Sequence, residues 1–349
     1  MSDFHSLKIK EIKRETPSAV SVSFDVPAEL KDTFQFEAGQ YITIKKEIDG
    51  EELRRAYSIC EAPQNENLKV AIKEMPNGTF SKFANQSLQE GTVLEVMPPE
   101  GRFTFIPNGT VKNIAAFAAG SGITPILGIA KTVLQNDVEN TFTLVYGNRS
   151  LEDTIFRDEL LELKEKYTER FNLYFVYSQS DEDDALFGRI DRSIVNLITK
   201  NKHKDTAFDA FYLCGPQAMI ETVSDTLVEN GIDKTKILFE LFTSEDTEAT
   251  IDADLEGKTK VKVLVDDEEF EFVMDQKQTV LEAALKENID APYSCQGGIC
   301  SSCIAKLKEG KVVMDKNQIL TDGELEEGFI LTCQSHPTTP KIVVDYDDV

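Results

Sequence analysis

The sequence predicts a multidomain protein made of an antiparallel β-barrel, an α/β doubly wound domain and a smaller α+β domain. Short strands separated by turns fill the chain up to residue 108, and apolar strands alternating with amphipathic helices follow from Asn113 onward. An acidic stretch near residue 250 then divides the chain a second time. The length of 349 residues agrees with several domains, because single domains usually have about 100–200 residues.

Residues 1–108 are expected to form the barrel. The segments SVSFDV, QYITIKK, LKVAIKE and TVLEVM have the composition of short strands, and Gly, Pro, Asn and acidic residues separate them. Many short strands with such turns are typical of an antiparallel barrel or sandwich. One helical segment, SKFANQSLQ, interrupts the strands.

Residues 109–243 are expected to form the doubly wound domain. Continuous apolar segments such as NIAAFAA, FTLVYG and AFYLCG alternate with helical segments such as TPILGIAKTVLQ and QAMIETVSDTLVENG. This alternation indicates a parallel sheet covered by helices on both faces. Residues 244–258 are acidic and almost without apolar side chains, which predicts a linker, and residues 259–349 form the third domain.

The formal net charge of −25 bears on possible partners. Without a long basic block, a nucleic-acid or anionic membrane partner is not expected. No apolar segment approaches the ~18–20 residues that a membrane span needs, and the N-terminus lacks the pattern of a secretory signal. These features predict a cytoplasmic protein, and the sequence does not indicate its oligomeric state.

Four of the six cysteines lie close to the C-terminus. They are Cys295, Cys300, Cys303 and Cys333, and their spacing is that of a plant-type [2Fe-2S] ferredoxin. Gly297 and Gly298 give the loop the backbone freedom needed to turn thiolates inward. Zinc is the alternative metal, but zinc sites usually consist of two paired Cys-x2-Cys units.

The segments around these cysteines carry a resemblance to a known family. PYSCQGGICSSC, GFILTCQSHP and the terminal VVDYD resemble the ferredoxin domain of phenylacetyl-CoA epoxidase reductase subunits, and the resemblance covers the whole chain, domain order included. In that family a module of the ferredoxin-NADP reductase superfamily precedes a β-grasp ferredoxin domain. The resemblance therefore implies an NAD(P)H-dependent flavin and iron–sulfur oxidoreductase.

Two segments resemble the flavin-binding motifs of that superfamily. In the first, the resemblance implies that an arginine holds flavin phosphate, a tyrosine stacks on the isoalloxazine and a serine faces the flavin N5 atom. In the second, amides at a helix N-terminus meet the pyrophosphate. FAD is favoured over FMN because the closest match is to FAD-dependent relatives. The predicted flavin residues are Arg55, Ala56, Tyr57, Ser58, Gly78, Thr79, Phe80 and Ser81.

A third segment has the construction of a dinucleotide site. It follows the apolar strand NIAAFAA and opens a helix, and its glycines permit close approach of a pyrophosphate. We predict Thr124 as the N-cap and Pro125 as the first helical residue. A plain turn between strand and helix is the alternative. The residues of this segment are Gly120, Ser121, Gly122, Thr124 and Pro125.

The resemblance also assigns residues to the place of hydride transfer. Cys214-Gly215-Pro216 matches a segment that places a thiol near the nicotinamide, although Cys214 alone would be interpreted as a core residue. Glu240 and Phe242 match residues that line the same place. The predicted catalytic residues are Ser58, Cys214 and Glu240.

The choice between NADPH and NADH depends on the segment after FTLVYG. The segment Asn148-Arg149-Ser150 lacks an acidic residue to bind the ribose 2′-hydroxyl, and it offers Arg149, followed by Ser150, to a 2′-phosphate. NADPH is therefore predicted, with NADH as the alternative.

The resemblance implies that electrons leave the cluster for an oxygenase component that epoxidises the ring of phenylacetyl-CoA. Reductases of Rieske dioxygenases or other hydroxylases share the same modules and remain alternatives, as does a general diaphorase without a dedicated oxygenase. A redox-sensing nucleotide-binding module is an alternative of a different class. A flavohaemoglobin is excluded because the chain lacks a globin segment and contains only three histidines.

Overall fold

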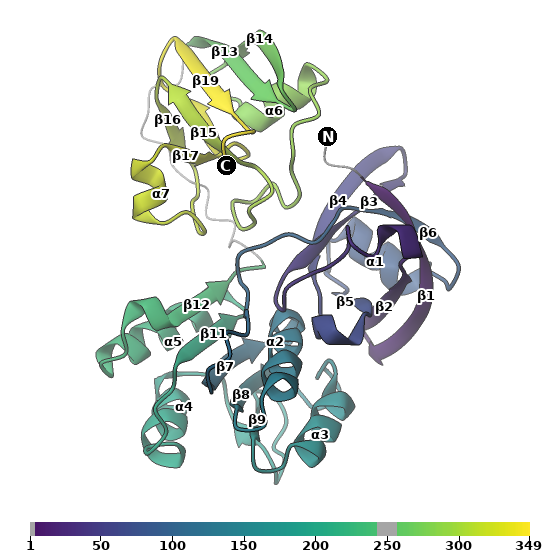
Figure 1. Cartoon of the computed structure of the whole chain (residues 1–349), viewed down its shortest axis with the longest axis vertical. Helices are drawn as coiled ribbons and strands as arrows, with labels where there is room; N and C mark the ends of the chain where they lie inside the picture. Colours follow the sequence, from purple (N-terminus) through teal and green to yellow (C-terminus); the bar gives the residue numbers. More distant parts are fainter. Residues whose placement is uncertain (1–3, 243–256) are drawn as a thin grey trace. The chain divides into compact units, whose positions relative to one another are not determined.

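The computed structural model describes residues 4–242 and 257–349, which belong to two compact units (Figure 1). The first unit contains the antiparallel and the parallel sheets, and the second contains a mixed sheet. Most of the predicted linker, residues 244–256, lies outside the described residues. Its predicted end at residue 258 falls on Lys258, the first residue of a strand.

The N-terminal part folds into a six-stranded antiparallel sheet. Along one strand, Leu7 and Ile9 are buried while Lys8 and Lys10 are exposed, as expected for a sheet with one face on the core. The elements are β1 His5–Thr16, β2 Ala19–Asp25, η1 Ala28–Leu30, β3 Tyr41–Ile48, β4 Glu51–Ser58, η2 Pro63–Asn65, β5 Leu68–Lys73, α1 Thr79–Gln86 and β6 Val93–Val96. The strand order is β4-β3-β6-β1-β2-β5.

The two outer strands of this sheet meet and close it. Directly after β4, Ile59 forms an antiparallel bridge with Val70 of β5, and the Cys60 amide donates to the Lys69 carbonyl at 2.9 Å. The predicted antiparallel barrel is therefore confirmed. Strand β4 has the charged sequence EELRRAYS, and the segment Arg55–Ser58 forms its second half.

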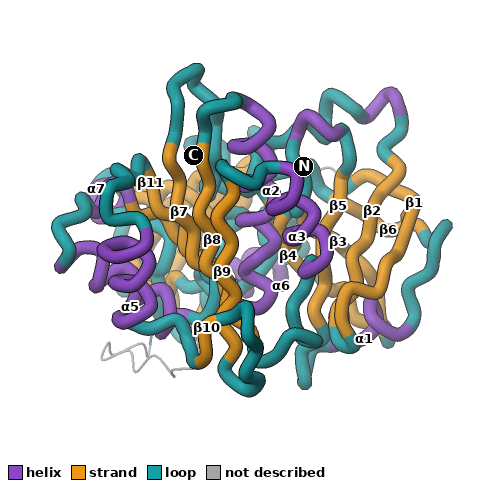
Figure 2. The backbone as a smooth tube through the Cα atoms, turned by 90° about the horizontal axis from the view of Figure 1, so that it is seen from below, coloured by secondary structure: helices purple, strands orange, loops and turns teal. Residues whose placement is uncertain are grey.

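The second sheet is parallel, with helices on both faces; α2 and α3 lie on one side and α5 on the other (Figure 2). Its order is β10-β9-β8-β7-β11-β12, so the chain builds outward from β7 first in one direction and then in the other. The elements are β7 Asn113–Ala119, η3 Gly120–Gly122, α2 Ile123–Asn136, β8 Thr141–Asn148, α3 Arg157–Lys166, β9 Phe171–Tyr177, β10 Leu186–Phe187, α4 Arg192–Asn196, the π-helix η4 Leu197–Lys202, β11 Ala210–Cys214, α5 Gln217–Glu229, η5 Lys234–Lys236 and β12 Ile237–Glu240.

The barrel and the parallel sheet share one apolar core. Cys60 and Phe103 from the N-terminal part belong to the same buried cluster as Ile126 and Ile129 of α2. The Tyr212 hydroxyl of β11 also donates to the Thr104 carbonyl at 3.0 Å. These contacts hold the two sheets in one unit.

Residues 257–349 form a mixed five-stranded sheet in the order β14-β13-β19-β15-β17. The first and last strands, β13 and β19, are parallel neighbours, and their buried residues belong to a core that also contains the buried face of α6. The predicted β-grasp fold is thereby confirmed. The elements are β13 Lys258–Val265, β14 Glu268–Asp275, α6 Val280–Lys286, β15 Ile304–Glu309, β16 Val312–Met314, α7 Asp322–Glu326, β17 Phe329–Leu331, β18 Ser335–Pro337 and β19 Lys341–Asp345.

Candidate functional site

The strand order of the parallel sheet reverses between β7 and β11, and a crevice at the carboxyl ends of the strands is expected at such a reversal. The turn η3 follows β7 at this point, and Gly215 follows β11. A Cβ atom on Gly122 would lie 2.1 Å from the Cys214 carbonyl oxygen, and Gly120 has a φ of +55°. Glycine is therefore needed at both positions for the turn to lie against β11.

The predicted cap of α2 is wrong. The helix begins at Ile123 with Gly122 as its N-cap, and Thr124 already lies inside the first turn. The Thr124 hydroxyl donates to the Ser121 carbonyl at 3.0 Å and does not accept from a helix amide. Because η3 leads directly into α2, Pro125 is the third helical residue and not the first.

The three predicted catalytic residues converge, although they come from three strands. The Ser58 hydroxyl, at the end of β4, donates to a Glu240 carboxylate oxygen at 3.2 Å. Glu240 ends β12 and is the register neighbour of Cys214 at the end of β11. Burial, reinforced by the charge of Glu240, raises the pKa of the Cys214 thiol well above its ordinary value. This thiol is therefore protonated at neutral pH and is not a nucleophile.

The predicted flavin residues lie on β4 and at the start of α1. The Arg55 guanidinium donates to the Arg54 carbonyl at 2.7 Å, and the Tyr57 ring lies 5.7 Å from the Phe80 ring. The Phe80 side chain is only 1% exposed, so this residue supports Tyr57 from the core and can reach a cofactor only through its backbone.

The loop before α1 is held by Ser81. The Ser81 hydroxyl accepts from the Met75 amide at 3.0 Å and donates to the Gly78 carbonyl at 3.2 Å. Gly78 is the N-cap, with Thr79 as the first residue of α1. The amides at this helix N-terminus provide a donor set of the kind that binds phosphate.

Sequence reasoning missed Lys73, the last residue of β5. Its ammonium group lies 3.6 Å from the position that a Cβ atom on Gly120 would take. Burial lowers the pKa of Lys73, Asp153 opposes that shift and Arg149 adds to it. A partly buried cation beside a glycine turn suits a phosphate group. The only signal in the sequence was a lysine at a strand end, which is too common to be specific.

Asp153 was missed as well. Its carboxylate accepts from the Ser150 hydroxyl at 3.3 Å, in the segment that follows β8 and also contains Arg149. The place where a nucleotide ribose is expected thus contains a cation and an anion within a few residues of each other.

The four C-terminal cysteines lie in two pairs. The Cys300 thiol lowers the pKa of its neighbour Cys295 to about 7, and the Cys303 thiol lowers the pKa of its neighbour Cys333. The Cys300 thiol also donates to the Ser302 hydroxyl at 3.6 Å. All four are free of disulfides. Among residues 4–242 and 257–349, no three acidic, cysteine or histidine side chains gather as ligands of one metal ion. Two thiol pairs match the two irons of a [2Fe-2S] cluster better than one tetrahedral zinc.

Backbone amides around the thiols fit an anionic group. The Gly297 amide donates to the Cys295 sulfur at 3.3 Å, and the Gly298 amide lowers the pKa of Cys333 by a hydrogen bond. The Gln334 side-chain amide lies 3.7 Å from the Cys333 sulfur. Donors to sulfur stabilise thiolates and adjust the potential of a cluster. The donor set therefore fits the predicted cluster.

Three domain families match this chain in the order that the fold suggests. Residues 6–105 match the oxidoreductase FAD-binding domain, residues 117–225 the oxidoreductase NAD-binding domain, and residues 263–338 the 2Fe-2S iron-sulfur cluster binding domain. The chain is an NAD(P)H-dependent FAD and 2Fe-2S oxidoreductase.

Full-length relatives define the family more closely. The chain is 38% identical to a subunit of 1,2-phenylacetyl-CoA epoxidase from Escherichia coli K12, over 99% of both chains. It is 31% identical to the ferredoxin reductase component of 3-ketosteroid-9-alpha-monooxygenase from Rhodococcus rhodochrous, over 97% of this chain and 96% of the relative. It belongs to this family of flavin and 2Fe-2S reductase components of multicomponent oxygenases.

A solved structure has the same modular architecture. Phthalate dioxygenase reductase, described as a modular structure for electron transfer from pyridine nucleotides to [2Fe-2S], superimposes with a TM-score of 0.62 at 25% identity, covering 98% of each chain. In the described part of the present chain, no helix has both the length and the hydropathy that a membrane span needs.

The close approach of η3 to β11 predicts that Gly122→Ala damages the nucleotide site. The added Cβ would overlap the Cys214 carbonyl, so the turn or the strand end must shift. We expect the free energy of unfolding to fall by about 1–3 kcal/mol and the nucleotide dissociation constant to rise. Chemical denaturation and titration measure the two effects. Gly323→Ala is the control, because its added Cβ meets no atom within 4 Å; unchanged values for Gly122→Ala would contradict the argument.

The paired thiols predict that Cys300→Ala abolishes the cluster while leaving flavin reduction by the nicotinamide intact. The substitution removes one sulfur of the Cys295 pair. Visible absorbance and electron paramagnetic resonance after reduction measure the cluster. Cys60→Ala is the matched control, since Cys60 is a buried free cysteine in the other unit. A cluster signal retained in Cys300→Ala would refute the ligand assignment.

Proposed function

We propose that this chain is the reductase component of a phenylacetyl-CoA ring epoxidase, which takes hydride from NADPH and delivers single electrons to the oxygenase component. The 38% identity to a phenylacetyl-CoA epoxidase subunit, against 31% to a ketosteroid monooxygenase reductase at similar coverage, supports this substrate. The observation that carries the redox part is the convergence of Ser58, Cys214 and Glu240.

We propose the same four segments of the chain that the sequence predicts. Residues 1–108 form the FAD-binding domain, residues 109–243 the NAD(P)-binding domain, residues 244–258 a linker and residues 259–349 the ferredoxin domain. The family matches at residues 6–105, 117–225 and 263–338 all lie within these limits.

Bound FAD would accept hydride from the reduced nicotinamide and release the two electrons one at a time to the [2Fe-2S] cluster. Glu240 accepts a hydrogen bond from the Ser58 hydroxyl and thereby orients that hydroxyl at the end of β4. The Cys214 thiol is fully buried and protonated, so it would line the site with an uncharged, non-nucleophilic group and help to exclude water from the reacting atoms. Such positioning supplies much of the rate in hydride transfer.

Other residues would bind the cofactors. Arg55 would pair with a flavin phosphate, and Tyr57, supported by Phe80, would cover the flavin ring. Gly215, Pro216 and Phe242 would line the nicotinamide. The amides of η3 and the Lys73 ammonium would bind the nucleotide pyrophosphate. Cys295 with Cys300, and Cys303 with Cys333, would each hold one iron.

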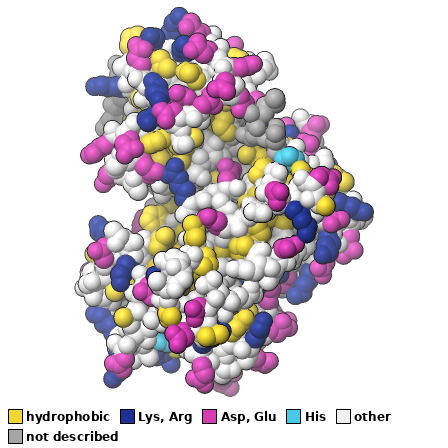
Figure 3. Space-filling view, in the orientation of Figure 1, with side chains coloured by type: hydrophobic (Ala, Val, Ile, Leu, Met, Phe, Trp, Pro, Cys, Tyr) yellow, Lys and Arg dark blue, Asp and Glu magenta, His cyan; other side chains and the backbone are white. Residues whose placement is uncertain are grey.

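The acceptor would be an oxygenase component docked near the cluster. On the face drawn in Figure 3, acidic side chains are spread widely among fewer lysines and arginines, in line with the net charge of −25. A partner that presents basic residues would be attracted by this surface, and the association rate would fall with added salt. If the chain were instead the reductase of another oxygenase, it would reduce a different partner. If it were a redox-sensing module, it would not oxidise the nicotinamide with multiple turnovers.

The experiment that tests this function is an anaerobic reduction followed by reconstitution. The purified protein should show flavin and iron–sulfur absorption bands that both bleach with stoichiometric NADPH. It should then support phenylacetyl-CoA epoxidation when added to the matching oxygenase component, and not support a Rieske dioxygenase. Bleaching of both bands without electron delivery to either oxygenase would indicate a different acceptor, and the absence of both bands would remove the enzymatic function.

The neighbouring Arg149 and Asp153 predict opposite effects on nucleotide preference. Arg149→Ala should lower the ratio of kcat/KM for NADPH to that for NADH by roughly tenfold or more, the worth of one charge-assisted hydrogen bond. Asp153→Asn should raise the same ratio, because a carboxylate repels a 2′-phosphate and accepts from a ribose hydroxyl. Steady-state kinetics with both nucleotides measure the ratio, and no change in either variant would remove the reason for choosing NADPH.

A further inference from the structure

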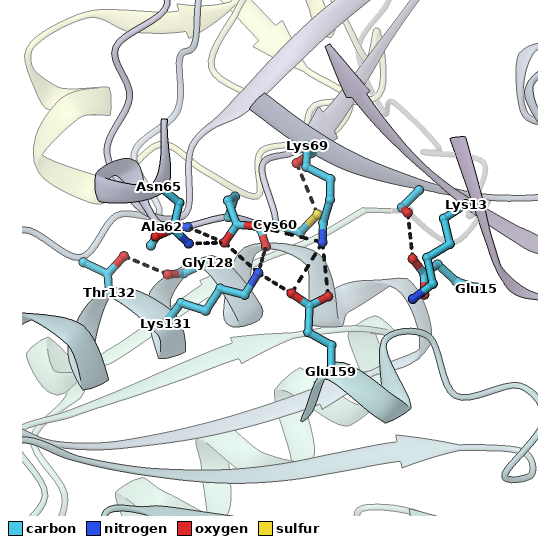
Figure 4. Close-up of polar contacts among 12 residues, drawn as sticks. Lys13, Glu15, Cys60, Ala62, Asn65, Lys69, Gly128, Lys131, Thr132 and Glu159 are labelled. Atoms are coloured by element: carbon cyan, nitrogen blue, oxygen red, sulfur yellow. Dashed lines mark hydrogen bonds and ion pairs between the residues drawn. The ribbon is translucent and has the colours of Figure 1, made fainter. Parts of the chain in front are cut away.

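Four charged side chains form a closed network where the barrel meets the parallel sheet. Lys131 of α2 contacts Glu61 at 2.6 Å and Glu159 of α3 at 2.5 Å. Lys69 of β5 contacts Glu159 at 3.1 Å and Glu61 at 3.9 Å. Positive and negative groups therefore alternate around the ring, and two of its contacts cross from barrel to sheet. Figure 4 shows Lys69 and Lys131 extending toward the Glu159 carboxylate.

This network is buried at Lys131 and Glu61 and half-buried at Lys69 and Glu159. The side chains of Lys131 and Glu61 are 5% and 8% exposed, and those of Lys69 and Glu159 are 15% and 23% exposed. Burial by itself would raise the pKa of Glu159, yet the ammonium groups of Lys131 and Lys69 lower it below its ordinary value. The Glu159 carboxylate is thus ionised at neutral pH, and the network places two lysines against two glutamates, so its formal charges balance.

Further hydrogen bonds fix the network to the backbone. Glu61 accepts from the Asn65 side chain at 2.8 Å and from the Ala62 amide at 3.1 Å, while Lys131 donates to the Cys60 carbonyl at 3.3 Å. One turn before Lys131, a Cβ atom on Gly128 would lie 2.9 Å from the Ile59 carbonyl oxygen and 3.0 Å from that of Glu61. Helix α2 therefore lies directly against the segment that follows β4.

The two elements joined here are those that carry the nucleotide turn and the catalytic serine. Helix α2 begins at the turn η3, and Lys131 lies two turns further along it. Glu61 follows Ser58 by three residues, and Ser58 is the group that donates to Glu240. A displacement of α2 along the barrel would move the nucleotide turn relative to Ser58.

Cohesion alone does not require these charges. The shared apolar core already holds the two sheets together, and a buried ion pair adds little stability over apolar residues of the same volume. Apolar contacts tolerate small sliding movements, whereas short charge-assisted hydrogen bonds fix distance and direction. Hydride transfer is sensitive to misplacements of about 1 Å.

We propose that the network of Glu61, Lys69, Lys131 and Glu159 positions the turn η3, which would bind the nucleotide, relative to the end of β4, which carries Ser58. The network thereby sets the geometry of hydride transfer. Lys131 and Glu61 are its central positioning residues. This inference rests on the proposed function, since it concerns the hydride step of that function.

The test compares the full-length, cofactor-loaded protein with Lys131→Met, Lys131→Arg and Glu61→Gln. Flavin reduction is followed by stopped flow with NADPH and with NADPH deuterated at the transferred position. For Lys131→Met we expect the rate at saturating NADPH to fall roughly ten- to a hundredfold. The primary isotope effect should become larger and more temperature dependent, while the nucleotide dissociation constant changes less than threefold. Lys131→Arg should recover part of the rate, because it restores the charge.

A readout independent of turnover is hydrogen–deuterium exchange of the same proteins. Lys131→Met should accelerate exchange in peptides covering residues 59–67 and 123–136, where the network joins barrel and helix. Lys260→Met is the matched control, because the Lys260–Glu271 pair is also short, at 2.8 Å, but is exposed and lies within the C-terminal unit. It should leave the hydride rate, the isotope effect and exchange in both peptides unchanged.

The outcomes separate this inference from the function on which it rests. If the wild-type flavin is not reduced by NADPH or NADH, the proposed function and the positioning role fail together. If the wild type is reduced normally and the variants match it in rate and isotope effect, only the positioning role is overturned. Should Lys131→Met not fold, Glu61→Gln decides, since it removes one charge at constant shape; wild-type rate and isotope effect in that variant would overturn the proposal.

Discussion

The reversal of strand order between β7 and β11 is the constraint on which the first unit depends. The connections that leave β7 and β11 lead to opposite faces of the sheet, so a crevice is expected between them at the carboxyl ends of the strands. The glycines of η3 lie there against the carbonyl group of Cys214. Strand β12 adds Glu240 beside Cys214, and the closed barrel brings Ser58 to the same place. Ser58, Cys214 and Glu240 are distant in the sequence, and they meet because strands of the barrel and of the parallel sheet end at the same place.

In the C-terminal unit the main constraint is that four cysteines, Cys295, Cys300, Cys303 and Cys333, must lie together in two pairs. Cys295 and Cys300 lie on one loop, whereas Cys303 precedes β15 and pairs with Cys333, which follows β17. Because β15 and β17 are antiparallel neighbours, the sheet itself brings the last two thiols together. The Thr332 amide and hydroxyl both donate to the Cys303 carbonyl, at 3.1 and 3.0 Å, which fixes this pair further.

Patterns confined to one stretch of sequence were sufficient to predict the fold class and the presence of a 2Fe-2S domain, and the proposed cluster ligands rest on the same kind of pattern. The spacing from Cys295 to Cys303 and the glycines of η3 are signals of this kind, because their function needs particular residues close together. Strand β4 escaped recognition because its charged sequence hides the alternation, and the role of Thr124 was wrong because η3 starts the helix earlier. Lys73 could not be found, since its significance arises from Gly120, Arg149 and Asp153, which are far along the chain. Asp153 was missed because an acidic residue four positions after Arg149 in a loop is not a specific signal.

The distribution of the apolar cores bears on how such proteins can recombine in evolution. Barrel residues such as Phe103 and helix residues such as Ile129 belong to one core, while the C-terminal unit has a core drawn from residues 261–346. A gene fusion that exchanges the C-terminal unit would leave both cores intact. An exchange of the barrel alone would need compensating changes in α2, so inheritance should keep the first two sheets together as one module.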